Sequence, residues 1–246
     1  MHKHAIITGT SGAIGQALAE KFKRSGYKIC AIDIKEIQDQ NVDFFIKTDL
    51  NQFVLNKNIQ EITFKKIETW LEKNHIDILI NNAAYQYVST SHPIDETEFM
   101  TSYNINVIAP YILISHLKNK MTKNTGNIIN IGSIHTKLTK PGFVAYATTK
   151  AALAALTRGL ALDYEDTVRI NCIEPASVET PMLHDGFKNA PESMRLLESY
   201  HPQKRIATPN EIAELAFFIS SEKIRFLHGA CIDISGGISS RLHDPL

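Results

Sequence analysis

The chain has 246 residues, and its 26 Lys and Arg balance 26 Asp and Glu, so the formal net charge is zero. No overall positive field exists to attract nucleic acid or an anionic membrane surface, and we expect neither as a partner. Hydrophobic residues make up 43% of the chain and charged residues 21%, a globular composition that excludes disorder for most of its length. We therefore expect one domain spanning residues 1–246.

Short apolar segments rich in β-branched residues alternate with helical patterns from one end to the other. The predicted strands are residues 5–8, 28–32, 44–47, 76–81, 127–131, 168–173 and 231–234. The predicted helices are residues 13–25, 59–73, 104–121, 145–164 and 210–220, the last signalled by Pro209 and Asn210. Strands that are apolar throughout are typical of a parallel sheet covered on both faces. The sequence thus predicts an α/β fold, a doubly wound parallel sheet (Rossmann fold) of about seven strands with helices on both faces.

Two further features concern organisation and location. Residues 177–208 form the longest irregular stretch, which we interpret as a substrate loop or lid within the domain. The cysteines, Cys30, Cys172 and Cys231, each lie in an apolar stretch without metal-ligand spacing, so we expect reduced core thiols, no metal and a cytoplasmic location. The start of the chain is too soon interrupted by Gly9 to be a signal peptide, and no apolar run approaches membrane-spanning length.

The first predicted strand ends in a glycine-rich turn, from Thr8 to Gly15, that leads directly into a helix. Glycines at such a turn let the backbone approach a pyrophosphate, and the helix N-terminus supplies free N–H groups. The turn alone is weak evidence, because glycines also make ordinary turns.

The second predicted strand ends in Asp33, where a carboxylate would accept hydrogen bonds from the adenine-ribose hydroxyls. An anion at this position repels a 2′-phosphate, which favours NAD over NADP. The alternative is that Asp33 only caps the following turn. Lys35 nearby leaves NADP use open.

Tyr146 and Lys150 lie four residues apart on a predicted helix, so both side chains point into one site. A lysine beside a tyrosine stabilises the phenolate, and we expect it to lower the phenol pKa from about 10. Ser133 closes the strand at 127–131, at the sheet edge where ligands of such folds bind. Singly, these are an ordinary helix-surface pair and a strand terminator; together they indicate a catalytic site.

With these motifs in order, the chain resembles the classical short-chain dehydrogenase/reductase (SDR) family over essentially its whole length. The matching positions are Thr8 to Gly15, Asp33, Asp49, Leu50, Asn81 to Ala84, Asn106, Val107, Ser133, Tyr146, Lys150, Asn171 to Pro175, Thr180, Pro181 and Asp233 to Gly237. Two positions depart from the family pattern, because Ala13 and Ala176 stand where glycine is common.

The resemblance implies an oxidoreductase that interconverts a CH–OH group and a carbonyl with NAD or NADP. Tyr146 is then the acid/base, Lys150 holds the nicotinamide ribose and lowers the Tyr146 pKa, Ser133 binds the substrate oxygen, and Asn106 anchors a relay water. The implied cofactor-binding residues are Gly9, Ser11, Gly12, Ala13, Ile14, Gly15, Asp33, Asp49, Leu50, Asn82, Ala83, Ala84, Tyr146, Lys150, Pro175, Val178 and Thr180. Family members commonly form homotetramers through the helix after Asn104 and the helix carrying Tyr146, with further contacts near the final strand.

Substrate identity depends on loops whose sequence is not a code. Gln86, His135 and His184, with Ser133 and Tyr146, predict a polar substrate site, which favours a sugar, polyol or hydroxy acid over a steroid. Because Asp33 favours NAD, and cellular NAD pools usually favour oxidation of the substrate, we expect oxidation as the physiological direction.

Two other functions stay open. A non-catalytic dinucleotide-binding sensor or scaffold would not need Ser133, Tyr146 and Lys150 intact. An epimerase or dehydratase of the extended family would carry a larger C-terminal substrate domain, whereas little chain follows Gly237.

Overall fold

The computed structural model describes residues 2–89, 94–187 and 191–242. Its strands are β1 (Lys3–Thr8), β2 (Tyr27–Asp33), β3 (Phe44–Lys47), β4 (Ile78–Asn81), β5 (Asn127–Ile131), β6 (Arg169–Pro175) and β7 (Cys231–Ile234). They form one sheet in the order β3-β2-β1-β4-β5-β6-β7, and every neighbouring pair is parallel. The predicted doubly wound parallel sheet is confirmed, and its strand order reverses between β1 and β4.

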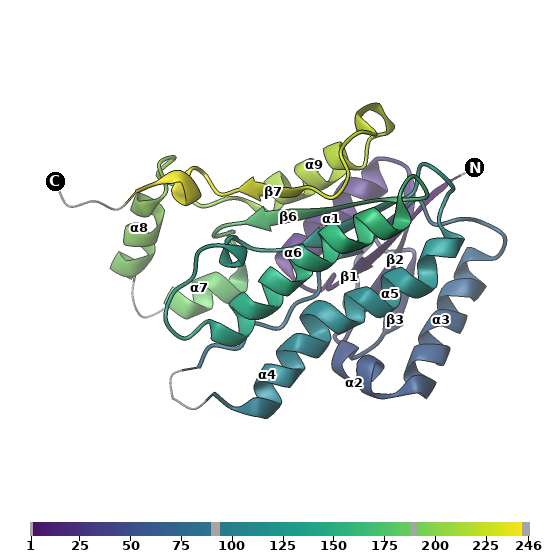
Figure 1. Ribbon diagram of the computed structural model, residues 1–246, viewed down its shortest axis with the longest axis horizontal. Coiled ribbons are helices and arrows are strands. Elements are labelled where there is room, and N and C mark those ends of the chain that lie inside the picture. The colour runs from purple at the N-terminus through teal and green to yellow at the C-terminus, as the bar shows by residue number, and fades with distance from the viewer. Residues whose placement is uncertain (1, 90–93, 188–190, 243–246) are drawn as a thin grey trace.

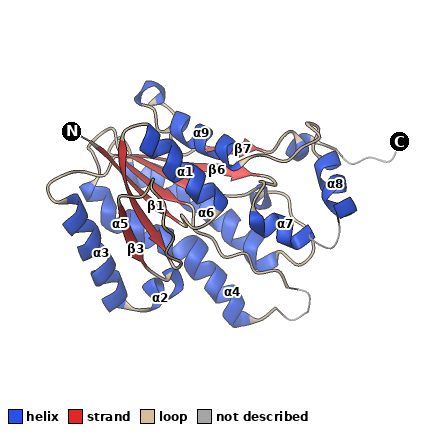
Figure 2. Cartoon of the chain, turned by 180° about the vertical axis from the view of Figure 1, so that it is seen from behind, coloured by secondary structure: helices blue, strands red, loops and turns tan. Residues whose placement is uncertain are grey.

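The helices cover both faces of this sheet (Figure 1; Figure 2). They are α1 (Ala13–Arg24), α2 (Leu50–Leu55), α3 (Lys57–Leu71), α4 (Glu96–Tyr103), α5 (Ala109–Leu117), α6 (Val144–Tyr164), α7 (Pro181–Phe187), α8 (Pro191–Tyr200) and α9 (Pro209–Ile219). Helices α3, α5 and α6 contribute to the core on one face, and α1 and α9 to the core on the other.

The central strands carry apolar side chains on both faces because consecutive side chains enter opposite cores. In β1, Ile6 belongs to the core to which α3, α5 and α6 contribute, whereas Ala5 and Ile7 belong to the core to which α1 and α9 contribute. All three side chains are fully buried. The two cores hold the sheet rigidly, so the loops at the carboxyl ends of the strands have a fixed platform.

The helix predicted at 104–121 begins earlier than expected. Asp95 caps α4 by accepting hydrogen bonds from the backbone N–H groups of Thr97 and Glu98. A five-residue π-helix, Asn104–Ile108, then joins α4 to α5. The sequence pattern failed here because the exposed first turns of α4 carry few apolar residues, and the cap rather than periodicity marks the helix start.

The stretch 177–208, predicted as irregular, contains α7 and α8, although its residues 188–190 lie outside the described residues. Figure 1 shows both helices beyond the arrowheads of β6 and β7. The start of α9 is set by Thr208, whose side chain accepts from the backbone N–H of Glu211 in a reciprocal capping box. The predicted position of this helix is confirmed, with Pro209 in its first turn.

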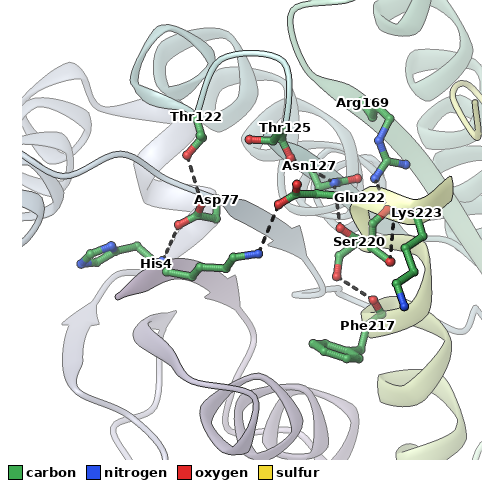
Figure 3. Close-up of polar contacts among 12 residues, drawn as sticks. His4, Asp77, Thr122, Thr125, Asn127, Arg169, Phe217, Ser220, Glu222 and Lys223 are labelled. Atoms are coloured by element: carbon green, nitrogen blue, oxygen red, sulfur yellow. Dashed lines mark hydrogen bonds and ion pairs between the residues drawn. The ribbon is translucent and has the colours of Figure 1, made fainter. Parts of the chain in front are cut away.

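The amino-terminal edge of the sheet is held by polar side chains (Figure 3). Asp77 accepts from the backbone N–H of His4 at 2.7 Å and from the Thr122 hydroxyl at 3.1 Å. The Arg169 guanidinium donates to the carbonyls of Ile219 and Leu227 at 3.1 and 3.0 Å, which anchors the end of α9 and the segment leading to β7. These contacts lie at the edge of the sheet opposite the site described below.

None of the helices in the described part of the chain has the length and apolarity that crossing a membrane requires.

Candidate active site

The turn between β1 and α1 is the first component of the site. Gly9 has a φ of +73°, and a Cβ on it would lie 2.6 Å from the Cα of Ala83. A Cβ on Gly15 would lie 2.1 Å from the Gly9 carbonyl oxygen. Among the described residues, no side chain caps the start of α1, and Gly12 stands at the N-cap. Close backbone packing and a helix N-terminus without a side-chain cap fit a pyrophosphate, and Ala13 is the first residue of the helix.

Asn82, which follows β4, locks this turn to the neighbouring strand end. Its side-chain amide donates to the carbonyls of Thr8 and Gly9 at 3.0 and 2.9 Å. In return, the Thr8 hydroxyl accepts from the backbone N–H groups of Asn82 and Ala83, both at 3.0 Å. The crevice between β1 and β4, where the strand order reverses, is therefore rigid before any ligand arrives.

Asp33 ends β2 beside the glycine turn. One carboxylate oxygen accepts from the backbone N–H of Ser11 at 2.8 Å, and the other from that of Lys35 at 3.0 Å. Asp33 thus does cap the following turn, as the alternative interpretation held, and it also lines the cavity described next. The two roles are compatible, because each carboxylate oxygen has further acceptor capacity.

A cavity of about 920 Å³ runs along the carboxyl ends of the strands, from the glycine turn to α7. Every residue predicted to bind the cofactor lines it: Gly9, Ser11, Gly12, Ala13, Ile14, Gly15, Asp33, Asp49, Leu50, Asn82, Ala83, Ala84, Tyr146, Lys150, Pro175, Val178 and Thr180. Gln86, Ser133 and His135 line it as well. The structure therefore joins the dinucleotide-type turn and the Ser–Tyr–Lys group in one cavity.

Ser133, Tyr146 and Lys150 meet at the end of β5. The Ser133 hydroxyl hydrogen-bonds the Tyr146 phenol and accepts from the backbone N–H of His135 at 3.2 Å. Tyr146 and Lys150 lie one turn apart on α6, with the lysine Nζ 5.6 Å from the centre of the phenol ring. The same Nζ donates to the Ile131 carbonyl at 2.7 Å, which fixes the buried lysine against the last residue of β5.

The pKa values of this group differ from the expected pattern. Burial raises the pKa of Tyr146 to about 12, against the opposing effect of its hydrogen bond with Ser133. Burial also lowers the pKa of Lys150 to about 8, and the neighbouring Cys172 opposes that change. The predicted lowering of the Tyr146 pKa by Lys150 is wrong, because the lysine ammonium is directed to the Ile131 carbonyl and burial raises the pKa of the phenol.

Asn106 lies in the π-helix and is buried, but it does not line the cavity. Its amide donates to the Tyr85 carbonyl and the Thr149 hydroxyl, both at 2.9 Å, and its Oδ1 accepts from the backbone N–H of Tyr85 at 2.7 Å. The side chain is thus engaged in holding the loop after β4 against α6, and its predicted link to a relay water stays a prediction.

His135 lies at the substrate end of the cavity. Its ring stacks on Phe143, with centroids 4.7 Å apart, and meets Tyr146 edge-on at 5.6 Å. Its Nδ1 lies 2.9 Å from the Thr139 hydroxyl. Burial, with a smaller effect of Lys140, lowers the pKa of His135 to about 4, so the imidazole is neutral near pH 7.

The substrate end is less polar than predicted. Val88, Phe143, Leu183 and Phe187 line it beside Gln86 and His135. His184 is not brought to the cavity: its side chain is 53% exposed on α7, 3.6 Å from Glu179. Sequence reasoning missed Leu183 and Phe187 because it treated this segment as irregular, whereas the α7 helix selects which of its side chains face inward.

Comparisons with known proteins agree with this geometry. The family model described as enoyl-(acyl carrier protein) reductase matches residues 9–239. An uncharacterized oxidoreductase of Thermotoga maritima is 31% identical over 96% of each chain. Glucose 1-dehydrogenase 2 of Bacillus subtilis is 28% identical over 96% of this chain and 95% of that protein. The ligand-free structure of aldohexose dehydrogenase from Thermoplasma acidophilum superposes with a TM-score of 0.90 at 25% identity, covering 100% of this chain and 98% of that one. The chain therefore belongs to the short-chain dehydrogenase/reductase family of oxidoreductases.

Proposed function

We propose that this protein interconverts a secondary alcohol and a ketone with a nicotinamide dinucleotide, preferring NAD. One observation carries the proposal: a single cavity joins the glycine turn and Asp33 at one end to Ser133, Tyr146 and Lys150 at the other. A protein that only binds a dinucleotide would not need the Ser133, Tyr146 and Lys150 group.

The roles of the residues follow from their positions. The turn at Gly9 to Gly15 and the start of α1 would hold the pyrophosphate, and the bound dinucleotide would supply the hydride donor or acceptor. Ser133 orients the substrate oxygen, and Tyr146 exchanges a proton with it. Lys150, fixed by the Ile131 carbonyl, places a positive charge next to the tyrosine and favours the phenolate as it forms.

The preference for NAD rests on Asp33. Its carboxylate is held in place by the N–H groups of Ser11 and Lys35, so it cannot turn away from a ribose 2′-phosphate. Repulsion between two anions would then disfavour NADP. The Lys35 side chain, which could offset that repulsion, is not among the described residues that line the cavity.

We propose a small hydroxylated substrate, a sugar, polyol or hydroxy acid, with oxidation as the favoured direction. Gln86 and His135 support hydrogen bonding to an uncharged polar group, since the His135 imidazole is neutral near pH 7. The names of two similar proteins, glucose 1-dehydrogenase 2 and aldohexose dehydrogenase, support the sugars first.

The test is NAD reduction, followed by absorbance, over a panel of sugars, polyols, hydroxy acids and steroids. We expect turnover that falls by about 10²–10⁴-fold in Tyr146→Phe while NAD binding, measured by calorimetry, is retained. Replacing NAD with NADP should lower kcat/KM at least about tenfold, and Asp33→Asn should narrow that gap because it removes the charge but keeps the shape. Undiminished turnover in Tyr146→Phe would reject the assigned acid/base.

We also propose that residues 1–246 act as one domain, with 177–208 as its substrate lid, and that copies associate as a homotetramer or dimer through α5 and α6. The outer face of α6 supports the association: Ala151, Ala155 and Gly159 are exposed at helical spacing, and Leu162 is 79% exposed. Ala145 and Ala154 instead are buried. A cytoplasmic location stays a prediction from the cysteine pattern.

A further inference from the structure

Two of the three cysteines lie together beside the proposed catalytic site. The sulfurs of Cys172 on β6 and Cys231 on β7 lie within 4.8 Å of each other and of a carboxylate oxygen of Glu174. We propose that Cys172 and Cys231 are a redox couple that a hydroperoxide converts into a reversible disulfide, and that this oxidation slows the enzyme. The regulatory half rests on the proposed function, and the covalent half does not.

The backbone already has the geometry that a disulfide needs. Cys172 and Cys231 are register partners on neighbouring parallel strands, and the backbone N–H of Cys172 donates to the Ala230 carbonyl at 2.8 Å. Paired strands lie about 4.8 Å apart. Disulfides form where the Cα atoms are about 4.4–6.8 Å apart. The register pairing thus places the two Cα atoms in the range that a disulfide spans, and the two sulfurs already lie within 4.8 Å of each other.

The two thiols differ in the way that a reactive and a resolving cysteine do. Cys172 is fully buried, whereas Cys231 is only partly buried on the edge strand. The Arg158 guanidinium lies 3.5 Å from the Cys231 sulfur. A hydrogen bond from Cys172, with Arg158 assisting, lowers the pKa of Cys231 and raises that of Cys172. The partly exposed Cys231 sulfur is therefore the better nucleophile of the two.

The chemistry balances with a hydroperoxide as the oxidant. The Cys231 thiolate attacks one oxygen of hydrogen peroxide, the O–O bond breaks, and a sulfenic acid and hydroxide form. The Cys172 thiol then attacks the sulfenic sulfur, so that the S–S bond forms and the S–O bond breaks with release of water. Overall, two thiols lose two electrons and two protons, and one peroxide becomes two waters. A dithiol reductant reverses the change by exchange.

Cys172 couples this pair to the proposed active site. A Cβ on Gly132 would lie 2.7 Å from the Cys172 sulfur, so that sulfur packs directly on the backbone before Ser133. Cys172 also interacts electrostatically with Lys150. A disulfide would draw the Cys172 sulfur toward Cys231 and so change its contacts with Gly132 and Lys150. Protein interiors transmit such shifts because they are close-packed.

Two thiols and a carboxylate are also ligand types for zinc, but the surrounding charges oppose that use. Lys137 lies 3.4 Å from the Glu174 carboxylate, and Arg158 contacts Cys231. Two of the three donors thus already face cations, and the Lys150 ammonium adds a third positive charge nearby.

The experiment treats reduced full-length protein with graded hydrogen peroxide, then denatures it, alkylates free thiols and identifies linked peptides by mass. We expect the alkylated thiols to fall from three to one, a Cys172–Cys231 linked peptide, and full recovery with dithiothreitol. Cys30→Ser is the matched control, since its thiol is buried in β2 and should not contribute. In Cys231→Ser, the remaining thiols should resist the same dose.

Turnover is measured on the same samples. In the wild type and in Cys30→Ser we expect peroxide to lower turnover at least fivefold and dithiothreitol to restore it. In Cys231→Ser we expect no such loss. The proposed redox couple would be overturned by any of three results. These are three free thiols after peroxide treatment, overoxidation of Cys231 without a disulfide, or one tightly bound zinc per chain that blocks oxidation. A disulfide with unchanged turnover would overturn its regulatory role. The disulfide-linked peptide is detected without any substrate. The redox couple can therefore be tested even if the proposed dehydrogenase activity is not found.

Discussion

The His135 side chain shows how one buried group makes stability depend on pH. In the folded protein burial lowers its pKa to about 4, whereas an exposed imidazole has a pKa of about 6.5. Above about pH 6.5 the imidazole is neutral in both states, and its contribution to stability is fully present. As the pH falls from 6.5 toward 4, the unfolded chain takes up a proton that the folded chain does not, so stability is lost.

We therefore expect the free energy of unfolding to fall by about 2 kcal/mol more in the wild type than in His135→Asn between pH 7.5 and pH 4.5. Asparagine keeps a polar group for Thr139 but does not titrate. Urea unfolding of both proteins at the two pH values measures the difference, in which all other titrating groups cancel. Parallel losses in the two proteins would show that His135 is protonated freely in the fold.

At the same scale, some site residues could be predicted from the sequence and others could not. Tyr146 and Lys150 share one helix face, so their spacing alone places them together. Whether Asn106 and His184 reach the cavity depends on a π-helix and on the rotation of α7, which no local pattern encodes. The Tyr146 pKa was predicted in the wrong direction because desolvation is a property of the assembled cavity.

At the scale of an element, the glycine turn before α1 offers a matched pair of substitutions. A Cβ on Gly15 would lie 2.1 Å from the Gly9 carbonyl oxygen, whereas a Cβ on Gly12 would meet the same oxygen at 3.7 Å, an ordinary contact. Helix propensity alone would make Gly15→Ala stabilising by about 1 kcal/mol. The steric clash of the new Cβ must therefore cost more than this gain if the substitution is to destabilise the protein.

We expect Gly15→Ala to lower the free energy of unfolding by at least about 2 kcal/mol and Gly12→Ala to change it by less than about 1 kcal/mol. Urea unfolding without added dinucleotide measures both, so that ligand binding does not enter. Equal effects of the two substitutions would mean that the turn relaxes easily, and that its glycines serve the ligand rather than the fold.

Elements with strong internal patterns were predictable, and those defined by capping were not. The predicted bounds of β3, β5 and β7 agree with the structure. The short helix α2 was missed because Asp49, assigned to the adenine pocket, also caps it through the N–H groups of Asn51 and Gln52. One residue thus serves both purposes, and sequence reasoning recorded only the functional one.

At the scale of the whole molecule, pairing between distant strands escapes the sequence. Cys172 and Cys231 are brought together by the register of β6 with β7, the last strand of the sheet. Taken within its own apolar stretch, each cysteine is predicted to be a reduced core thiol. Only the long-range contact between β6 and β7 shows that Cys172 and Cys231 are a pair.

Association of whole chains leads to the final prediction, which concerns the outer face of α6. Exposed leucines occur both there and elsewhere: Leu162 on α6 is 79% exposed, and Leu55 on α2 is 66% exposed. Neither side chain supports the monomer core, so Leu→Glu at either position should leave folding intact. If α6 packs against its counterpart in a second chain, only Leu162→Glu places a carboxylate in an apolar contact, where an unpaired charge is costly.

We expect sedimentation equilibrium to give the wild type and Leu55→Glu the same oligomeric mass and Leu162→Glu a smaller one. A wild-type monomer at every concentration would reject assembly altogether. An oligomer that survives Leu162→Glu would instead place the contact on another face of the molecule, because no close helix pairing through α6 could accommodate facing carboxylates.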